Sequence, residues 1–184
     1  MIMPPPLRKF ALATHLTFSV GWVGAVAGYL SLDLTAATSQ DPQMLRAVWI
    51  AMGLVVAWAI VPLSIAALLT GLLMSLGTKW GLFRHWWVLI SFVLTIFATL
   101  VLLSEAQVIG HMAAIAADPT TSNDELRDLP NTLPHSVGGL VVLLVVQVLN
   151  VYKPQGMTRY GWRKQREERM ALQRSKQDQE PTAA

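Results

Sequence analysis

Residues 86–103 read WWVLISFVLTIFATLVLL, an uncharged run of 18 apolar and hydroxyl-bearing residues. A run of this length is typical of a helix that crosses a lipid bilayer, because a spanning helix needs about 20 predominantly apolar residues. With its flanks, the run predicts a spanning helix over residues 85–110. The lipid bilayer is therefore the expected surroundings of this part of the chain.

Three further apolar runs predict spanning helices over residues 10–32, 44–76 and 137–152. The second run is longer than a bilayer is thick, so we expect its helix to tilt or project. Pro62 lies inside that run and should kink the helix. The fold class that follows is all-α: a bundle of four transmembrane helices in residues 1–152, with a basic tail in residues 153–184.

Composition agrees with a membrane protein and excludes several kinds of site. The chain of 184 residues is 53% hydrophobic and only 14% charged, whereas soluble domains usually carry about 25% charged residues. Its mean hydropathy is +0.45. It contains no cysteine, which excludes disulfides, iron–sulfur clusters and thiolate metal sites.

The predicted connections are residues 33–43, 77–84 and 111–136. The third is long and contains Ser122-Asn123-Asp124-Glu125, a capping-box pattern. This pattern predicts a short surface helix that ends before Pro130.

The positive charges are concentrated in alternate connections. The N-terminus, residues 77–84 and the tail hold twelve of the fourteen Lys and Arg residues, and Arg46 and Arg127 are the other two. Because cytoplasmic loops carry the excess of Lys and Arg, both termini are expected in the cytoplasm, an N-in/C-in topology. The basic tail is then expected to lie on anionic lipid, and no nucleic-acid partner is expected.

The first predicted span has two different faces at 100° per residue. One is a stripe of small residues, which we expect to let another helix approach closely: Ala13, Thr17, Gly21, Gly24 and Gly28. The other carries a histidine, a hydroxyl and aromatic side chains with polar groups: His15, Ser19, Trp22, Val26 and Tyr29.

The four histidines are the main candidates for a functional site. The topology groups His15 with His85 toward the cytoplasmic side, and His111 with His135 toward the outer side. Imidazole is an axial ligand of haem iron and also suits copper, and helical bundles build such sites from facing helices. These residues are therefore the predicted metal ligands of one or two haem b groups, with Trp22 beside the porphyrin.

Structural roles for the same residues stay open. A histidine at a helix end is often an interfacial anchor, and His15 would then serve in hydrogen-bonded packing. Glu105 lies at membrane depth, where a carboxyl tends to be paired or neutral. It is either a proton relay or metal-site neighbour, or a partner in a hydrogen bond to Gln147 or another helix.

The stretch His15-Leu-Thr-Phe-Ser-Val-Gly-Trp22-Val-Gly24 resembles the first-helix motif of the CopD copper-resistance proteins and the HemJ protoporphyrinogen oxidases. Over nearly its full length the chain resembles an uncharacterised family of bacterial four-helix integral membrane proteins. That resemblance rests on the stretches at residues 7–10, 69–71, 81–87 and 151–161. It implies a bacterial inner membrane location and four spans, and the motif implies that His15 binds haem.

The leading hypothesis is a haem-b-binding membrane protein with a redox, electron-transfer or haem-handling role. The alternative is a copper-binding or copper-transport-related protein that uses the same imidazoles. A third hypothesis is a non-catalytic subunit, for which the small-residue stripe would dock a partner. The partners considered are the bilayer, a second copy of the chain and a redox protein, and the sequence assigns no catalytic residue.

Overall fold

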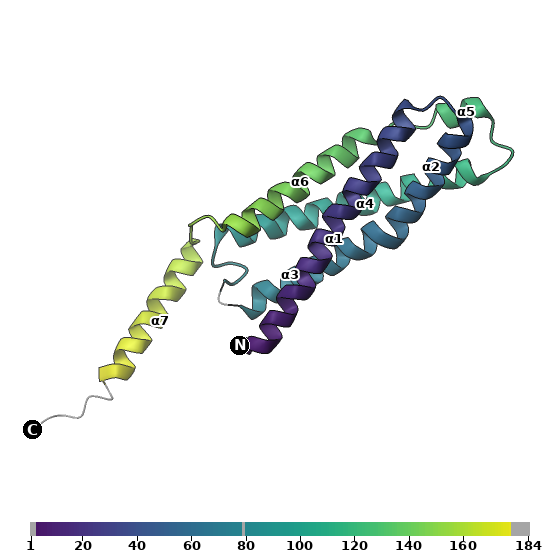
Figure 1. Cartoon of the computed structure of the whole chain (residues 1–184). Coiled ribbons are helices and arrows are strands. Elements are labelled where there is room, and N and C mark those ends of the chain that lie inside the picture. The colour runs from purple at the N-terminus through teal and green to yellow at the C-terminus, as the bar shows by residue number, and fades with distance from the viewer. Residues whose placement is uncertain (1–2, 79, 178–184) are drawn as a thin grey trace, which may run out of the picture.

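The computed structural model describes residues 3–78 and 80–177. Every element in these ranges is helical (Figure 1). In chain order the elements are α1 (Pro5–Thr38), α2 (Pro42–Val55), the π-helix η1 (Val56–Ile60), α3 (Val61–Gly77), α4 (Trp86–Ala117), α5 (Asn123–Arg127), α6 (Leu133–Tyr152) and α7 (Arg159–Gln177).

Four helices in the described ranges are long and apolar enough to span a membrane, which confirms the all-α prediction. They are Pro5–Thr38, the continuous α2–η1–α3 helix Pro42–Gly77, Trp86–Ala117 and Leu133–Tyr152. The α1 helix packs against α3, α2 and α6, and α4 packs against α2, α3 and α6. The buried cluster between them includes Trp22, Trp49, Met52, Ile60 and Met112.

The disturbance expected at Pro62 takes the form of a π-helical turn. Proline lacks the backbone N–H, and its ring would collide with the carbonyl group four residues earlier in a regular α-helix. The five residues of η1 end two positions before Pro62, and the Val61 N–H donates to the Val56 carbonyl oxygen, five residues back. The wider turn accommodates the proline ring without ending the helix.

Three helices extend beyond the predicted spans, because the helical backbone continues past the first polar residue. The first helix extends to Thr38, so Asp33 lies inside it and not in a connection. The third extends to Ala117, so His111 lies within α4. The fourth starts at Leu133, which places His135 in its first turn. Hydropathy falls at these residues, but the helical backbone continues wherever the polar side chain finds a partner or solvent.

The predicted short helix is confirmed as α5. The Ser122 side chain accepts from the Glu125 N–H, and the Glu125 carboxylate accepts from the Ser122 N–H at 2.8 Å. Nearby, Arg46 fixes the end of α4 by donating to the carbonyl oxygens of Ala116, at 3.1 Å, and Asp118, at 2.7 Å. A cation at a helix C-terminus satisfies carbonyl groups that have no helical partner.

The small-residue stripe does not pack as the sequence predicted. A Cβ added at Gly24 or Gly28 would meet nothing within 4 Å, whereas one at Gly21 would contact Leu63 at 3.5 Å. The opposite face of α1 is the buried one, with Trp22 and Tyr29 at 4% and 5% exposure. Large aromatic side chains bury more apolar area than glycines do, so they determine which face turns inward.

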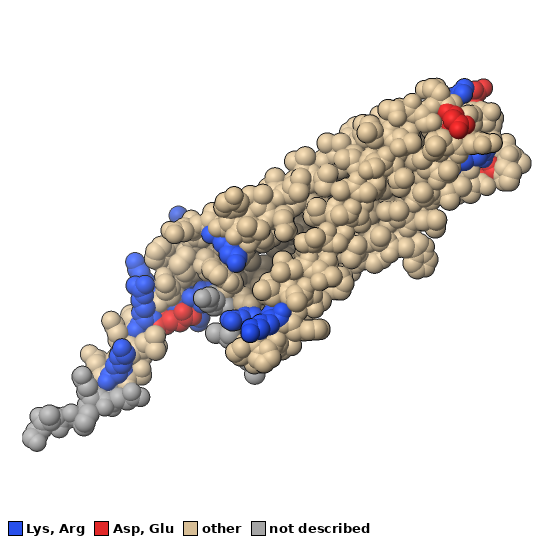
Figure 2. Space-filling model, viewed as in Figure 1, with Lys and Arg blue, Asp and Glu red and all other residues tan. Residues whose placement is uncertain are grey.

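Both ends of the described chain lie at one end of the bundle, which we call the basic end. Here the Met3 N–H donates to the Gly77 carbonyl oxygen at 3.0 Å, and α7 begins (Figure 1). Figure 2 shows most of the visible Lys and Arg gathered at this end, with an acidic group among them, and both acidic and basic side chains at the opposite end, near α5. Between them the surface is apolar and includes Trp58, at 80% exposure, as expected of lipid-facing helices.

The start of the C-terminal segment is attached to the turn before α4. The Trp86 N–H donates to the Gly156 carbonyl oxygen at 3.2 Å, and the Thr158 N–H to that of Arg84 at 3.0 Å. The Arg84 guanidinium also forms a bidentate pair with Glu168, at 3.0 and 3.2 Å. The sequence predicted only a polar tail, whereas the structure gives a helix, α7, anchored at its first turns.

Candidate functional site

A cavity of about 320 Å³ lies within the bundle between α1, η1, α4 and α6. We call it the bundle cavity. Most of its wall is aliphatic or aromatic, and it reaches the lipid-facing surface beside Phe97, which is 59% exposed. Its polar lining residues are few, and they come from three helices: Trp22, Tyr29, Glu105, Thr132, His135 and Ser136. An apolar pocket with a few polar groups is the usual form of a small-molecule site.

Trp22 and Tyr29 line the cavity from α1. They are seven residues apart on α1, so they share one face and lie about 10 Å apart along the axis. Both side chains are at least nine-tenths buried. The indole N–H has no hydrogen-bond partner among the described residues, whereas the phenol hydroxyl has the Thr132 side chain beside it. Leaving the buried indole donor unpaired costs roughly 1–3 kcal/mol.

Glu105 of α4 and His135 of α6 meet at the wall of the cavity. The His135 Nε2 lies 3.6 Å from a Glu105 carboxylate oxygen, an ion pair when the imidazole is protonated. The Glu105 side chain is 23% exposed and that of His135 58%. The sequence singled out both residues, and the structure shows that the helix partner of Glu105 is the α6 histidine.

Sequence reasoning missed a third polar feature, the buried carboxyl group of Asp33. Only 1% of this residue is exposed. Its two carboxylate oxygens accept hydrogen bonds from the hydroxyl groups of Thr132, at 2.7 Å, and Ser136, at 2.6 Å. Asp33 lies on the same helical face as Trp22, Val26 and Tyr29, because these residues are three or four positions apart. This repeat is the sequence pattern that could have identified Asp33.

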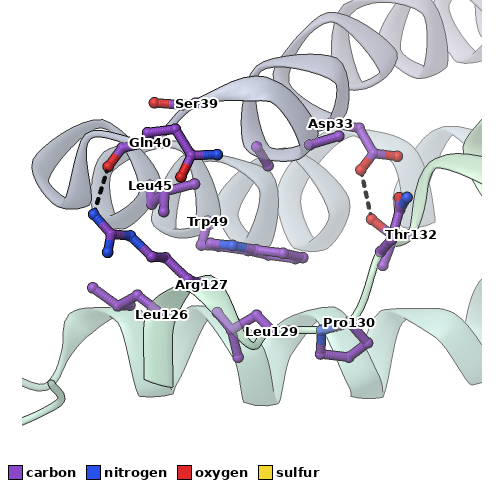
Figure 3. Close-up of a pocket in the computed structure, with 13 residues that line it drawn as sticks. Asp33, Ser39, Gln40, Leu45, Trp49, Leu126, Arg127, Leu129, Pro130 and Thr132 are labelled. Carbon is purple, nitrogen blue, oxygen red and sulfur yellow. Dashed lines mark hydrogen bonds between the residues drawn. The ribbon is translucent and has the colours of Figure 1, made fainter. Parts of the chain in front are cut away.

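A second, smaller pocket of about 190 Å³ lies beyond Asp33, at the α5 end of the bundle. We call it the end pocket. Figure 3 shows Asp33 hydrogen bonded to Thr132 on one side of it, and Arg127 donating to the Gln40 carbonyl oxygen on the other. Thr132 lines both pockets, so the Asp33 cluster separates the end pocket from the bundle cavity.

His15 holds α1 against α3. Its Nδ1 lies 3.0 Å from the Thr70 hydroxyl oxygen. Its Cε1 would lie 3.1 Å from a Cβ at position 71, so the ring packs closely on Gly71. It is half-buried and does not line the bundle cavity. This geometry agrees with the hydrogen-bonded packing role that the sequence left open.

His85 and His111 also stand apart from the bundle cavity. The Nδ1 of His85 lies 2.7 Å from the Trp80 carbonyl oxygen, and the two rings meet edge to face at 5.3 Å. His111 is exposed on α4. Of the predicted site residues, the structure therefore brings Trp22, Glu105 and His135 to one cavity. In residues 3–78 and 80–177 no three or more His, Asp or Glu side chains gather as a metal site.

Comparison of the chain with protein-family models, curated proteins and solved structures found no match. The function therefore has to be inferred from the cavity and its residues.

Proposed function

We propose that this chain is an integral membrane protein that binds a small, largely apolar ligand inside its helical bundle. The observation that carries the proposal is the bundle cavity itself, a mostly apolar space whose wall includes a few polar side chains from three helices. Its volume of about 320 Å³ lies at the lower end of the range typical of ligand pockets, roughly 300–1,000 Å³.

Two structural features support a ligand over an empty packing defect. The cavity touches the lipid-facing surface, so an apolar molecule has an entry path from the bilayer. Its polar groups converge from different helices: Tyr29 from α1, Glu105 from α4 and His135 from α6. A packing defect is expected to be lined by apolar groups alone. A polar group that faces an empty space has no hydrogen bond to offset the free-energy cost of removing it from water.

Haem b is the cofactor favoured by the sequence, and one observation supports it here: His135 and Trp22 both line the cavity. His135 would ligate the iron through its ring, Trp22 would flank the macrocycle, and the haem would supply one-electron chemistry. This arrangement uses one imidazole from the cavity lining, and differs from the His15 and His85 pair that the topology suggested. The His15 ring lies within hydrogen-bond distance of the Thr70 hydroxyl, and the His85 ring within hydrogen-bond distance of the Trp80 carbonyl oxygen.

A histidine scan tests the haem proposal. The chain is purified in detergent after expression with haem supply, and its Soret and reduced α-bands are recorded for His135→Ala, His15→Ala and His111→Ala. Loss of the bands in His135→Ala alone supports haem in the cavity. Loss in His15→Ala supports the motif-based site. A colourless wild-type protein with full occupancy of another ligand overturns haem b and leaves the cavity proposal standing.

Copper is the alternative cofactor, and the Glu105–His135 pair is the feature that favours it. One carboxylate and one imidazole give two ligands within 3.6 Å of each other. Imidazole suits copper, but a stable site needs further ligands from outside this pair or from a partner chain. Elemental analysis of purified protein separates the two proposals, since the haem protein carries iron and the copper protein does not.

A partner-subunit role is favoured by the open glycine face of α1. Gly24 and Gly28 have nothing within 4 Å of an added Cβ, so this Gly-x-x-x-Gly face is available to another helix, from a second copy or another membrane protein. Crosslinking in membranes through a cysteine placed at Ala27 tests it. Crosslinked dimer that disappears in Gly24→Leu supports the role, and monomer in every case contradicts it.

We propose further that both termini face the cytoplasm of a bacterial inner membrane. The support is the charge distribution of Figure 2, with the basic end holding Arg8, Lys9, Arg84 and α7. The α7 cations would then lie on anionic lipid. Because the chain has no cysteine, Gln155→Cys and Asn131→Cys report each end separately. An impermeant thiol reagent added to intact spheroplasts should label Asn131→Cys only. Labelling of Gln155→Cys would reverse the topology.

A further inference from the structure

We propose that the bundle cavity holds one acyl chain of a membrane lipid, with the head group of that lipid at the α5 end of the bundle. This inference rests on the proposed function, because it names the ligand class of the same cavity. Two observations carry it: the cavity extends along the bundle axis for the depth of one bilayer leaflet, and its charged and hydroxyl-bearing lining residues lie toward the α5 end.

The lining residues show how far the cavity extends. On α6 they run from Pro134 to Leu143, a rise of about 14 Å. On α4 they run from Phe97 to Ile109, a rise of about 18 Å. A sphere of about 320 Å³ would be much shorter than either distance, so the cavity is longer than it is wide.

The position of the cavity along α6 matches one leaflet of the bilayer. The 20 residues of α6 rise about 30 Å, which is the thickness of the hydrocarbon core of a typical bilayer. The cavity begins in the first turn of α6, at Pro134 and His135, and ends about half-way along the helix, at Leu143. It therefore reaches from one membrane surface to about the midplane, which is the depth that the acyl chains of one leaflet occupy.

The polarity of the lining changes along this length. Glu105 and His135 meet at the surface end, where Thr132 and Ser136 also line the cavity. Trp22 lines the cavity nearer the midplane, but its indole nitrogen is not accessible from it. The other residues that line the midplane end are aliphatic or aromatic: Ile60, Phe97, Ala98, Val142 and Leu143. A lipid in the same leaflet has the same order, with a polar head at the surface and an apolar chain toward the midplane.

Two glycines of α6 provide the space and its lateral entrance. Gly138 and Gly139 both line the cavity, and a Cβ added at either would meet nothing within 4 Å. Because neither residue has a side chain, α6 leaves room beside α4 that a larger residue would fill. Gly138 and Phe97 are exposed on the lipid-facing surface, so an acyl chain can enter sideways without leaving its leaflet.

Other apolar ligands satisfy fewer of these features. A compact molecule would fill only part of a space as long as a leaflet is deep, and the unfilled part would lose van der Waals contacts. A hydrocarbon without a head group would leave the Glu105 and His135 end without a polar partner. An acyl chain with its head group fills the length and matches both ends.

Photolabelling in vesicles tests the inference. The full-length protein is reconstituted into phosphatidylethanolamine and phosphatidylglycerol vesicles, together with a phosphatidylethanolamine that carries a diazirine near the end of one acyl chain. Tandem mass spectrometry identifies the labelled residues. This chain-end probe should label Ala98 and Val142, at the midplane end, whereas a probe with its diazirine beside the ester group should label Glu105. Leu100, which is 61% exposed, reports lipid on the outer surface of the bundle.

Glycine variants show whether the label depends on the cavity. Gly139→Leu fills it, and Gly138→Leu closes its entrance from an exposed position, which keeps the test decisive if Gly139→Leu does not fold. Each should lower labelling of Ala98 and Val142 relative to Leu100 about tenfold or more, because the leucine occupies the space of the chain. Gly110→Leu is the matched control and should leave labelling unchanged. A Cβ at Gly110 also meets nothing within 4 Å, and this glycine does not line the cavity.

A compact apolar probe, adamantane diazirine, separates this inference from the proposed function. If it labels Ala98 and Val142 in wild type but not in Gly139→Leu, while the lipid probe labels only Leu100, the acyl chain is overturned and the cavity stands as a site for a compact ligand. Labelling of Ala98 by the ester-side probe also overturns the inference, since the lipid would then be reversed. If neither probe labels the cavity and the protein binds no haem, or if labelling survives both α6 substitutions, both proposals are overturned.

Discussion

Thr132 donates a 2.7 Å hydrogen bond to Asp33, which lies 99 positions earlier in the chain. Ser136, one turn further along α6, donates to the other carboxylate oxygen at 2.6 Å. The first turn of α6 is thereby fixed to α1, and the negative group sits beside the positive end of the α6 dipole. This clamp also positions His135, which lies between the two hydroxyl donors and faces Glu105.

Replacing Asp33 by Ala should destabilise the bundle by about 2–4 kcal/mol, because two buried hydroxyl groups lose their acceptor. Thermal unfolding in detergent, compared with wild type, measures the loss. Asp33→Asn keeps one acceptor oxygen and should recover part of it. Asp124→Ala is the control, since its exposed pair with Arg127 contributes no more than about 1 kcal/mol. Equal midpoints for Asp33→Ala and Asp124→Ala would contradict the clamp.

Gly53→Ala should weaken the α2–α4 contact. A Cβ at this position would lie 2.6 Å from the Ala113 Cβ, closer than two carbon atoms can approach. Overpacking typically costs about 1–3 kcal/mol, against a gain in helix propensity of about 1 kcal/mol. The thermal midpoint should therefore fall, while Gly110→Ala, with nothing within 4 Å, should leave it equal or higher.

The double variant Gly53→Ala/Ala113→Gly tests whether the contact itself is responsible. Exchanging the methyl group between helices restores the available space, so stability should return toward wild type. A double variant less stable than either single change would show that position 53 needs glycine for another reason.

Gly161→Ala should detach α7 from the bundle. An added Cβ would lie 2.4 Å from the Arg84 carbonyl oxygen, a backbone atom that cannot move away easily. Trypsin should then cleave within the Lys- and Arg-rich α7 several-fold faster than in wild type, because the segment opens more often. Gly156→Ala, whose added Cβ would lie 3.8 Å from Trp86, should be cleaved at the wild-type rate.

Asp118, just beyond the end of α4, should titrate at a lower pH than an ordinary aspartate. The Thr120 hydroxyl and backbone N–H donate to its carboxylate at 2.7 and 2.8 Å and lower its pKa. Its contribution to stability is therefore complete above the unfolded-state pKa and is lost as pH falls through the lower folded-state pKa. Carbon-detected NMR should show the pKa of Asp118 rising toward the ordinary value in Thr120→Val. An unchanged titration would assign the shift to another group.

The number and order of the spans could be predicted from the sequence because a bilayer imposes a length and a composition on each helix. The α5 capping box was equally readable, since its hydrogen bonds join residues three positions apart. Pro62 likewise predicts a local distortion of its helix. The surrounding packing then determines that the distortion is a π-helical turn. These features depend on neighbours in the chain.

The candidate site could be predicted only in part. The sequence predicts Trp22 and His135 at a haem site and Glu105 as a proton relay, site neighbour or hydrogen-bond partner, and all three line one cavity. The pairing of the histidines rested on depth alone and gave no information on rotation about each helix axis. The structure gives His15 a contact with Thr70 and His85 one with Trp80, partners that hydropathy cannot identify.

The amino-acid sequence by itself determined that this chain is helical, has four helices long and apolar enough to cross a membrane, and concentrates its Lys and Arg at the N-terminus, before α4 and in the tail. Tertiary structure alone decided that Asp33 is buried, that the glycine face of α1 is open and that Trp22, Glu105 and His135 line one cavity. The reason is physical: the hydropathy and the helix propensity of a segment depend only on residues that are close together in the sequence. The burial of a carboxyl group, by contrast, depends on hydroxyl groups about a hundred residues away.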